Sequence, residues 1–431
     1  MKYQAPKGTY DILPGEIERW QTLEARTRGV MDLFGYREVR TPMFESTDLF
    51  VRAVGGATDI VRKELYTFED KGGRSLTLRP EGTAPLVRAY VANPALQQTL
   101  PARLYYIGPM FRYERPQAGR FRQFWQIGAE LLGSAKPIAD AEMIDLFVAI
   151  LRDMGLAKAT VLLNSLGDST CRPVYRERIR AYFEAHRDSL CEDDRERLER
   201  NPLRILDCKV PKCAPIIRGA PSVLDSLCEP CREHFDGVQS LLRGLQGIEF
   251  KIESRLVRGL DYYTRTVFEV HAEGLGAQNA VGGGGRYDDL VKDFGGPDTP
   301  AIGFSIGMER LIASSGLGSD LPRVDACVIS MNPEAAPEAM RLARSLRDQL
   351  AGPPSRRRSL RVLVDVAGRS AGAQMKWASK TGARWAVFVP RDPEGYSVRN
   401  MDEGKDEPRQ SDERALREFL LERRAAAEAA T

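Results

Sequence analysis

The chain has 431 residues, 42% hydrophobic and 29% charged, which is enough for two or three domains with ordinary cores. Its 63 basic and 60 acidic residues leave a net charge of +3, which excludes a chain-wide attraction to a polyanion and confines any nucleic-acid contact to local patches. The N-terminus has no basic region followed by an apolar stretch, and no run of about eighteen apolar residues occurs, so a soluble, unexported protein is expected.

The first 155 residues predict a sheet with helices packed beside it. Helical periodicity marks 16–35 and 140–155, and extended runs occupy 64–70, 75–80, 103–114 and 121–133. The last two runs are joined by the polar, basic connection "RPQAGR", which predicts a hairpin with a long tip. Strands separated by short turns favour an antiparallel sheet with flanking helices.

The character of the sequence changes over 170–247. Charged helices such as "VYRERIRAYFEAHRDSL" and most of the cysteines fall in this range, which is typical of an inserted subdomain. From "RVDACVIS" onward, strand, helix, strand, helix and strand alternate as in a small α/β unit with parallel strands. We therefore expect one domain over 1–320, interrupted by the insert, and a second over 325–425.

The stretch "RGLDYY" stands directly before the strand-like run "TRTVFEV". It places Arg258, Asp261, Tyr262 and Tyr263 beside a glycine, a set of polar groups that a plain core strand does not need. One interpretation is a salt-bridged strand entrance with tyrosines as amphipathic filler. The other is a binding site at the start of the strand.

Two further stretches could form a phosphate-binding pocket. Glu81 and Thr83 flank Gly82 directly after a strand, where they could point into a pocket or simply cap the following helix. The hairpin carries four arginines, and on its second strand Gln126 and Glu130 share one face. Arginine forks suit phosphate, although a solvated hairpin would also carry charges. These arginines are Arg112, Arg115, Arg120 and Arg122.

Two glycine-containing stretches follow later in the chain. In "AIGFSIGMERL", Arg310 begins a helix after Gly303 and Gly307, which allow close backbone approach or helix packing. "VGGGGRYDDLV" has neither the P-loop nor the dinucleotide-binding spacing, yet Arg286 and Tyr287 fit a loop that approaches a ligand closely.

Histidine catalysis is nearly excluded. The chain has three histidines and no serine–histidine–aspartate or metalloprotease spacing. The chemistry must therefore use arginines, carboxylates, glutamine and tyrosines, which suits a reaction driven by positioning and by charge stabilisation around phosphate.

Taken together, "RPEGT", "FRYERPQAGRFRQFWQIGAE", "LVRGLDYYTRTVFEV", "GGGGRYDDLV" and "GFSIGMERL" closely resemble the histidyl-tRNA synthetases, in matching order. These are class II aminoacyl-tRNA synthetases, whose three motifs would be the region around Pro42, the arginine hairpin and the Arg310 segment. The segment 368–389 is similar to the anticodon-binding domain of that family. The resemblance weakens at "GPPSRRRS" and beyond about residue 395.

The resemblance implies an α+β catalytic domain with an antiparallel sheet flanked by helices, a helical insert and a C-terminal α/β anticodon-binding domain. It also implies a cytoplasmic homodimer that joins histidine and ATP into histidyl-adenylate and then transfers histidine to the 3′ end of its tRNA. The main alternative is the synthetase-like regulatory subunit of ATP phosphoribosyltransferase, which lacks the anticodon-binding domain. Another is an RNA-binding accessory protein with an inactive synthetase fold, which would need degraded motifs.

By resemblance, Arg258 and Arg112 are the catalytic residues that stabilise charge at the α-phosphate of ATP. ATP would also contact Arg120, Arg310 and, through its adenine, Phe124, with Mg²⁺ carried by the nucleotide. Arg115 and Gln117 would reach the acceptor end of tRNA. Tyr263 and Glu130 would hold the two ring nitrogens of histidine. The full histidine site implied is Glu81, Gly82, Thr83, Arg112, Gln126, Glu130, Arg258, Tyr262, Tyr263 and Tyr287.

Seven cysteines without a secretion signal indicate a reducing compartment and argue against a disulfide framework. Four of them in the insert have a spacing that fits one zinc site stapling this small region. Reduced structural thiols are the alternative. The four residues are Cys208, Cys213, Cys228 and Cys231.

Overall fold

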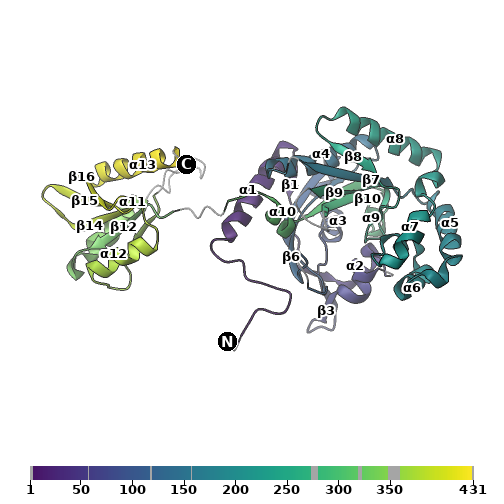
Figure 1. Cartoon of the computed structure of the whole chain (residues 1–431), viewed down its shortest axis with the longest axis horizontal. Helices are drawn as coiled ribbons and strands as arrows, with labels where there is room; N and C mark the ends of the chain where they lie inside the picture. The colour runs from purple at the N-terminus through teal and green to yellow at the C-terminus, as the bar shows by residue number, and fades with distance from the viewer. Residues whose placement is uncertain are drawn as a thin grey trace. The chain divides into compact units, whose positions relative to one another are not determined.

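The computed structural model describes residues 3–56, 58–116, 119–156, 158–272, 280–318, 323–347 and 360–429. The chain divides into two compact units, Met1–Ser319 and Asp320–Thr431 (Figure 1). Gln117 and the basic segment 355–359 lie outside the described residues. None of the helices in the described ranges combines the length and the apolar character needed to cross a bilayer.

The first unit is built on an eight-stranded sheet with the order β1-β5-β6-β11-β10-β9-β7-β8. Its central pairs are antiparallel, which confirms the predicted sheet, whereas the edge pairs β1–β5 and β7–β8 are parallel. Parallel neighbours need a long crossover, and the insert supplies one between β7 and β8. The strands are β1 (Arg37–Glu38), β5 (Ala102–Phe111), β6 (Gln123–Leu132), β7 (Ala159–Ser165), β8 (Glu249–Ile252), β9 (Thr264–Ala272), β10 (Ala280–Arg286) and β11 (Ala301–Gly307).

Helices pack on both faces of this sheet. One face contacts α1 (Ile17–Leu33), α4 (Pro137–Asp153), α8 (Glu229–Gly244) and α10 (Met308–Ser314), around a core in which Phe147 packs edge-on against Phe268 and Phe304. The other face packs against α2 (Thr47–Val54), α3 (Thr83–Ala92) and α9 (Leu290–Asp293). Along β6, Ile127, Ala129 and Leu131 belong to the first core. The alternating residues Gln126 and Glu130 therefore face the second side.

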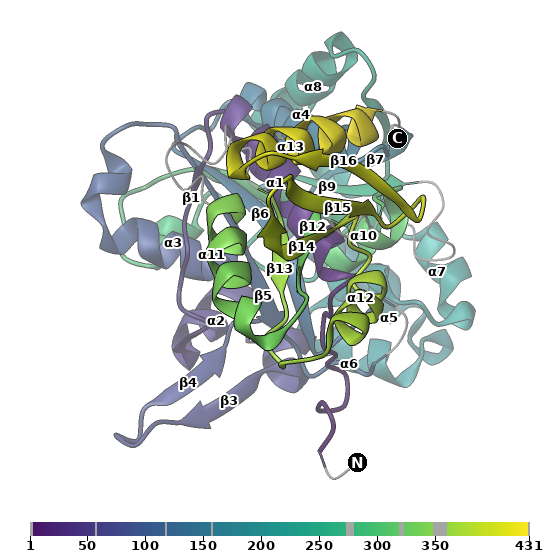
Figure 2. The ribbon, with the colours of Figure 1, turned by 90° about the vertical axis from the view of Figure 1, so that its left-hand side faces the viewer.

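A smaller sheet has the order β2-β4-β3, with β2 (Phe44–Ser46), β3 (Tyr66–Glu69) and β4 (Ser75–Leu78). Figure 2 shows the β3–β4 hairpin extending outward from α2 and α3. Arg79, which directly follows β4, donates to the carbonyls of Pro109 and Thr41 and so ties this sheet to the end of β5.

The insert is helical, as predicted. It contains α5 (Arg172–Glu184), α6 (Glu192–Arg200) and α7 (Ala214–Gly219), with short 3₁₀ turns at Pro202–Asp207 and Pro211–Cys213. Tyr175, Ile179, Phe183 and Leu198 build a separate small core. The helix α8 falls within the predicted insert range but packs against α4 in the main core.

The second unit has a five-stranded sheet with the order β13-β12-β14-β15-β16. The predicted alternation is confirmed, since β12 pairs in parallel with β13 and β14. Two further strands and a terminal helix follow the predicted pattern and complete the unit. β16 is charged and largely exposed, and for this reason its sequence shows no apolar alternation. The elements are β12 (Ala326–Ser330), α11 (Ala336–Arg347), β13 (Val362–Val364), α12 (Ala371–Lys380), β14 (Trp385–Asp392), β15 (Gly395–Asn400), β16 (Lys405–Gln410) and α13 (Glu413–Ala429).

Candidate active site

A cavity of about 470 Å³ opens over β6, β9, β10 and β11 in the first unit. Three segments far apart in the sequence contribute to its polar lining, namely the turn before α3, the arginine hairpin and the "RGLDYY" stretch. This convergence favours the site interpretation of all three. The predicted site residues that line the cavity are Glu81, Thr83, Arg112, Arg120, Phe124, Gln126, Arg258, Tyr262, Tyr263 and Arg310.

Glu130 lies beside this lining and is completely buried. Its Oε1 accepts a hydrogen bond from Oγ1 of Thr83 at 2.7 Å, and its Oε2 accepts one from the phenol of Tyr287 at 2.5 Å. Burial raises the pKa of Glu130 to about 8, although both hydrogen bonds favour the ionised form. Gly303 pairs with Glu130 across β11 and β6, and a Cβ there would overlap Oε2. Gly303 therefore makes room for the carboxyl.

Glu81 joins the cavity to the start of α3. Its carboxylate accepts from the backbone amides of Thr83 at 2.7 Å and Ala84 at 2.9 Å. The turn interpretation of this stretch is thus correct, and Glu81 also lines the cavity. Burial raises its pKa against the lowering effect of these amides. Gly82 lies under the ring of Tyr106, where a Cβ would overlap the aromatic carbons.

Gln126 lines the cavity and contains an unpaired acceptor. Its side chain is buried, and Oε1 has no hydrogen-bond partner within the described part of the chain. An unpaired buried acceptor costs about 1–3 kcal/mol of stability, and a hydrogen-bond donor from a ligand would offset that cost.

Arg258 fits both interpretations of the "RGLDYY" stretch, because it forms a salt bridge and also lines the cavity. It lines the cavity, and its Nη1 lies 2.7 Å from Oε2 of Glu269 on β9. The other oxygen of Glu269 accepts from Nε2 of His271 at 2.7 Å. The ion pair therefore fixes the guanidinium at the wall of the cavity.

The insert holds this stretch from outside. Nη1 of Arg204 donates to the carbonyl of Arg258 at 2.9 Å, and Nη2 lies 3.3 Å from Oδ1 of Asp261. Asn201 donates to the same oxygen at 3.2 Å. The backbone amide of Asp261 bonds to the carbonyl of Val54 at the end of α2. The loop is thus anchored by two separate segments.

Two tyrosines complete this side of the cavity. The ring of Tyr262 lies 4.7 Å from that of Tyr263 and 5.6 Å from that of Tyr287, measured between centroids. Burial raises the pKa of Tyr263, and the charge of Arg258 partly offsets this effect. Its phenol is therefore a neutral hydrogen-bonding group at physiological pH.

Three further arginines line the cavity. Arg112 donates to the carbonyl of Pro80 at 2.8 Å and stacks over the ring of Phe124 at 5.3 Å. Nη1 of Arg120 lies 3.4 Å from Glu114. Nη1 of Arg310 donates to the carbonyl of Ala280 at 2.8 Å. Burial and the nearby charge of Arg120 lower the pKa of Arg310, as expected for cations held close together.

Two hairpin arginines lie away from this cavity lining. Arg115 is exposed near the hairpin tip. Arg122 stacks over Tyr113 with its Cζ 3.9 Å from the ring centroid and donates to the carbonyl of Glu114 at 3.2 Å. Arg122 therefore stabilises the hairpin and does not line the cavity.

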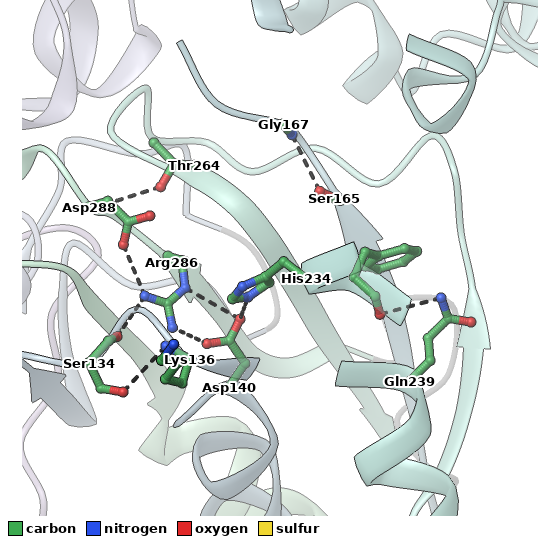
Figure 3. A network of polar contacts seen from close by, with 11 residues as sticks. Ser134, Lys136, Asp140, Ser165, Gly167, His234, Gln239, Thr264, Arg286 and Asp288 are labelled. Carbon is green, nitrogen blue, oxygen red and sulfur yellow. Dashed lines mark hydrogen bonds and ion pairs between the residues drawn. The ribbon is translucent and has the colours of Figure 1, made fainter. Parts of the chain in front are cut away.

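The glycine run is not the predicted loop, because its residues form β10 between β9 and β11, although Ala280, Val281 and Gly282 of this strand do line the cavity. Arg286 does not reach the cavity but is fully buried in a network with Asp140 and Asp288 (Figure 3). Nε2 of His234 lies 2.8 Å from the same Asp140 carboxylate. Successive side chains of a strand point to opposite faces, which separates Arg286 from Tyr287.

The prediction that four cysteines of the insert form a single zinc site is also wrong, because the four lie in two separate clusters. Cys228 and Cys231 lie with Cys171 and Asp168, whereas Cys208 and Cys213 lie with Cys191 and Asp194. Spacing along the chain pairs neighbouring cysteines, but it gives no information on which pairs meet in space.

Sequence reasoning missed several charged groups that line the cavity. Glu269 and Arg204 line it, as does Glu309, whose Oε1 accepts from the amide of Trp125 at 2.9 Å. Burial raises the pKa of Glu309 to about 7. The position of Glu309 next to Arg310 in the same motif could have identified it as a site residue, whereas no feature of the insert sequence pointed to Arg204.

The chain matches the family model described as histidyl-tRNA synthetase over residues 8–176 and 214–311. It is 49% identical over 393 residues to the histidine–tRNA ligase of Syntrophomonas wolfei, covering 90% of this chain and 91% of that protein. It is 51% identical over 395 residues to the histidine–tRNA ligase of Desulforudis audaxviator, with 91% and 92% coverage. The apo histidyl-tRNA synthetase of S. aureus superposes with a TM-score of 0.77 at 34% identity, covering 97% of this chain and all of that one.

Proposed function

Since the chain belongs to the histidyl-tRNA synthetase family, we propose that the cavity described above is where it activates histidine. Its activity is histidine–tRNA ligation. Histidine and ATP give histidyl-adenylate and pyrophosphate, and histidine then passes to the 3′ end of its tRNA with release of AMP. Relatives of nearly full length carry the ligase name, which favours this activity over the regulatory-subunit alternative.

The observation that carries the site proposal is that two sets of groups line one cavity. One set consists of buried carboxylates, an unpaired glutamine oxygen and tyrosines, and the other consists of arginines around Phe124. An amino acid with a polar ring suits the first set. A nucleotide triphosphate suits the second, because guanidinium forks bind phosphate oxygens and an aromatic face binds adenine.

Within the first set, Glu81, Thr83 and Gln126 hold the α-amino and carboxylate groups of histidine. Oε1 of Gln126 would gain the donor that it lacks without a ligand. Tyr263 and Glu130 hold the two ring nitrogens. Glu130 would have to engage the ring from its buried position beside Thr83 and Tyr287.

In the first step of the reaction, a carboxylate oxygen of histidine attacks the α-phosphorus while the bond from phosphorus to the pyrophosphate oxygen breaks. Arg112 and Arg258 stabilise the charge that develops on the α-phosphate. The ion pair with Glu269 holds Arg258 in place before ATP binds. Arg120 and Arg310 hold the outer phosphates, and Mg²⁺ enters with the nucleotide.

The tRNA contacts follow from the arginine hairpin and the second unit. Exposed Arg115 would reach the acceptor end, as would Gln117, which lies outside the described residues. The second unit would read the anticodon by stacking and edge contacts. We further propose a cytoplasmic homodimer assembled mainly through the first unit.

The activity is tested by ATP–pyrophosphate exchange with each amino acid in turn. Exchange that depends on histidine alone is expected. Exchange with another amino acid would overturn the assignment, and a lack of exchange would favour the regulatory-subunit alternative.

A further inference from the structure

Two four-residue clusters lie in the insert and at its start, each made of three cysteines and one aspartate. We call Asp168, Cys171, Cys228 and Cys231 the first tetrad, and Cys191, Asp194, Cys208 and Cys213 the second tetrad. In each tetrad, one potential ligand atom per residue lies within 4.8 Å of all the others. All seven cysteines of the chain are free thiols, so no disulfide accounts for either cluster.

The distances within the tetrads match four ligands around a single ion. A tetrahedral Zn²⁺ with bonds of about 2.3 Å to sulfur and about 2.1 Å to oxygen would place two sulfurs about 3.8 Å apart, and sulfur and oxygen about 3.6 Å apart. In the second tetrad, Sγ of Cys191 lies 3.8 Å from Sγ of Cys208. In the first, Oδ1 of Asp168 lies 3.6 Å from Sγ of Cys171 and 3.8 Å from Sγ of Cys228.

The second tetrad also contains an acceptor that lacks a partner. Asp194 is completely buried, and its Oδ2 accepts no hydrogen bond within the described ranges. Its Oδ1 lies 3.0 Å from Nη1 of Arg197. A buried carboxylate oxygen left unpaired beside three thiols is costly unless a cation completes its surroundings.

Outer contacts support ligand roles in both tetrads. Backbone amides point at sulfur, from Val210 to Cys208 at 3.4 Å and from Asp168 to Cys171 at 3.3 Å. Arg265 lies 3.4 Å from Oδ2 of Asp168. Three thiolates and one carboxylate around one divalent ion would give the site a net charge of about −2. A neighbouring arginine would partly neutralise this negative charge.

We propose that each tetrad binds one zinc ion, so that the insert carries two structural Cys₃Asp sites. Zinc is the metal that fits, because sulfur-rich tetrahedral sites select zinc or iron–sulfur centres, and the short ligand separations suit a single ion. Each site has four protein ligands and no open position, which is the pattern of a structural site.

The two sites would staple different parts of the insert. The first joins the turn before α5 to the start of α8, and the second joins the start of α6 to the turns around Cys208 and Cys213. Cys208 directly follows the 3₁₀ turn that contains Arg204, which holds Arg258 and Asp261. Zinc at the second tetrad would therefore stabilise the segment that anchors the cavity loop.

Metal analysis of the full chain, purified without chelator and supplied with zinc, tests the proposal. About two equivalents of zinc per chain are expected. Cys231→Ser and Asp194→Asn should each lose about one equivalent, from the first and second tetrad respectively. Cys327→Ser is the matched control, because this buried thiol lies in the second unit and should leave both equivalents bound.

Cobalt substitution of the unaltered chain gives a second measurement that does not depend on the variants folding. Two Co²⁺ ions with intense thiolate charge-transfer absorption are expected. One equivalent or fewer of bound metal, iron with sulfide in place of zinc, or intramolecular disulfides by mass spectrometry would each overturn the two-site proposal. Loss of zinc from the Cys327→Ser control would overturn it as well.

Discussion

The phenol of Tyr287 donates a 2.5 Å hydrogen bond to Oε2 of Glu130, a carboxyl with no exposed surface. This contact stabilises the ionised form, while burial and, to a smaller extent, the nearby Glu81 raise the pKa of Glu130 to about 8. The protonation of this carboxyl is therefore coupled to both the stability of the fold and the chemistry of the cavity.

The unfolding free energy of the chain without ligands should decline as pH rises toward 8. The pKa of Glu130 is raised from 4.5 to about 8 on folding, so its contribution is fully present below 4.5 and is lost as pH passes through the folded value. Each pKa unit corresponds to about 1.4 kcal/mol. Glu130→Gln should flatten the decline, as measured by denaturant unfolding from pH 5 to pH 9. An unchanged slope would contradict the assignment. Tyr287→Phe should instead move the upper limit of the decline above pH 8.

Glu130→Gln should also weaken histidine recognition more than ATP binding. If Glu130 accepts from a ring nitrogen, the amide leaves buried groups mismatched, at a cost of about 1–3 kcal/mol. We expect the KM for histidine in pyrophosphate exchange to rise about 10- to 100-fold, with the KM for ATP nearly unchanged. Equal losses for both substrates would argue against the ring contact.

Arg258→Ala should nearly abolish adenylate formation. Loss of one preorganised donor to a developing charge costs about a hundred- to a thousandfold in rate, or about 3 to 4 kcal/mol. Transfer from preformed histidyl-adenylate should suffer less, because the phosphate then leaves and is no longer attacked. Glu269→Gln is the matched control, since it removes the ion pair but keeps the guanidinium. A destabilised but fast Arg258→Ala enzyme would show that the ion pair with Glu269 is the main role of this residue.

Asp140→Ala should lower the free energy of unfolding by about 3 to 5 kcal/mol, because it leaves the buried Arg286 without its charge partner. Burial opposes the charge on Asp140, but Arg286 and His234 outweigh it and lower its pKa. The stabilisation is thus present above the unfolded pKa and is lost as pH falls through the folded value. Denaturant unfolding measures the effect, with exposed Glu184→Ala as a control expected to change little. Equal effects of the two variants would contradict the prediction.

Removal of the residues beyond 320 should leave a dimer, because the proposed interface belongs to the first unit and this unit is compact by itself. Light scattering of the truncated and full-length chains would give about twice the respective chain mass. A truncated chain that is monomeric while the full chain is dimeric would place the interface in the second unit.

The elements predicted from the sequence are those in which a local pattern coincides with the final packing. Two extended runs joined by a polar, basic connection located β5 and β6, and two glycines before Arg310 marked the change from β11 to α10. The orientation of Arg286 could not be predicted, because a run of four glycines carries no pattern of inward and outward side chains. The tetrads were missed for another reason, since Cys191 and Asp194 join Cys208 only through folding of the insert.

The strand order has a consequence for how the chain reaches this fold during synthesis. β11 is the last strand of the first unit to leave the ribosome, yet it lies in the middle of the sheet, between β6 and β10. Until it arrives, β5–β6 and β7–β9–β10 are two partial sheets, each with an unpaired edge that can associate with other chains. A nascent chain that stalls before residue 301 would therefore lack both the wall that accommodates Glu130 and the strand that joins the two halves. Such a chain would be a natural substrate for chaperones.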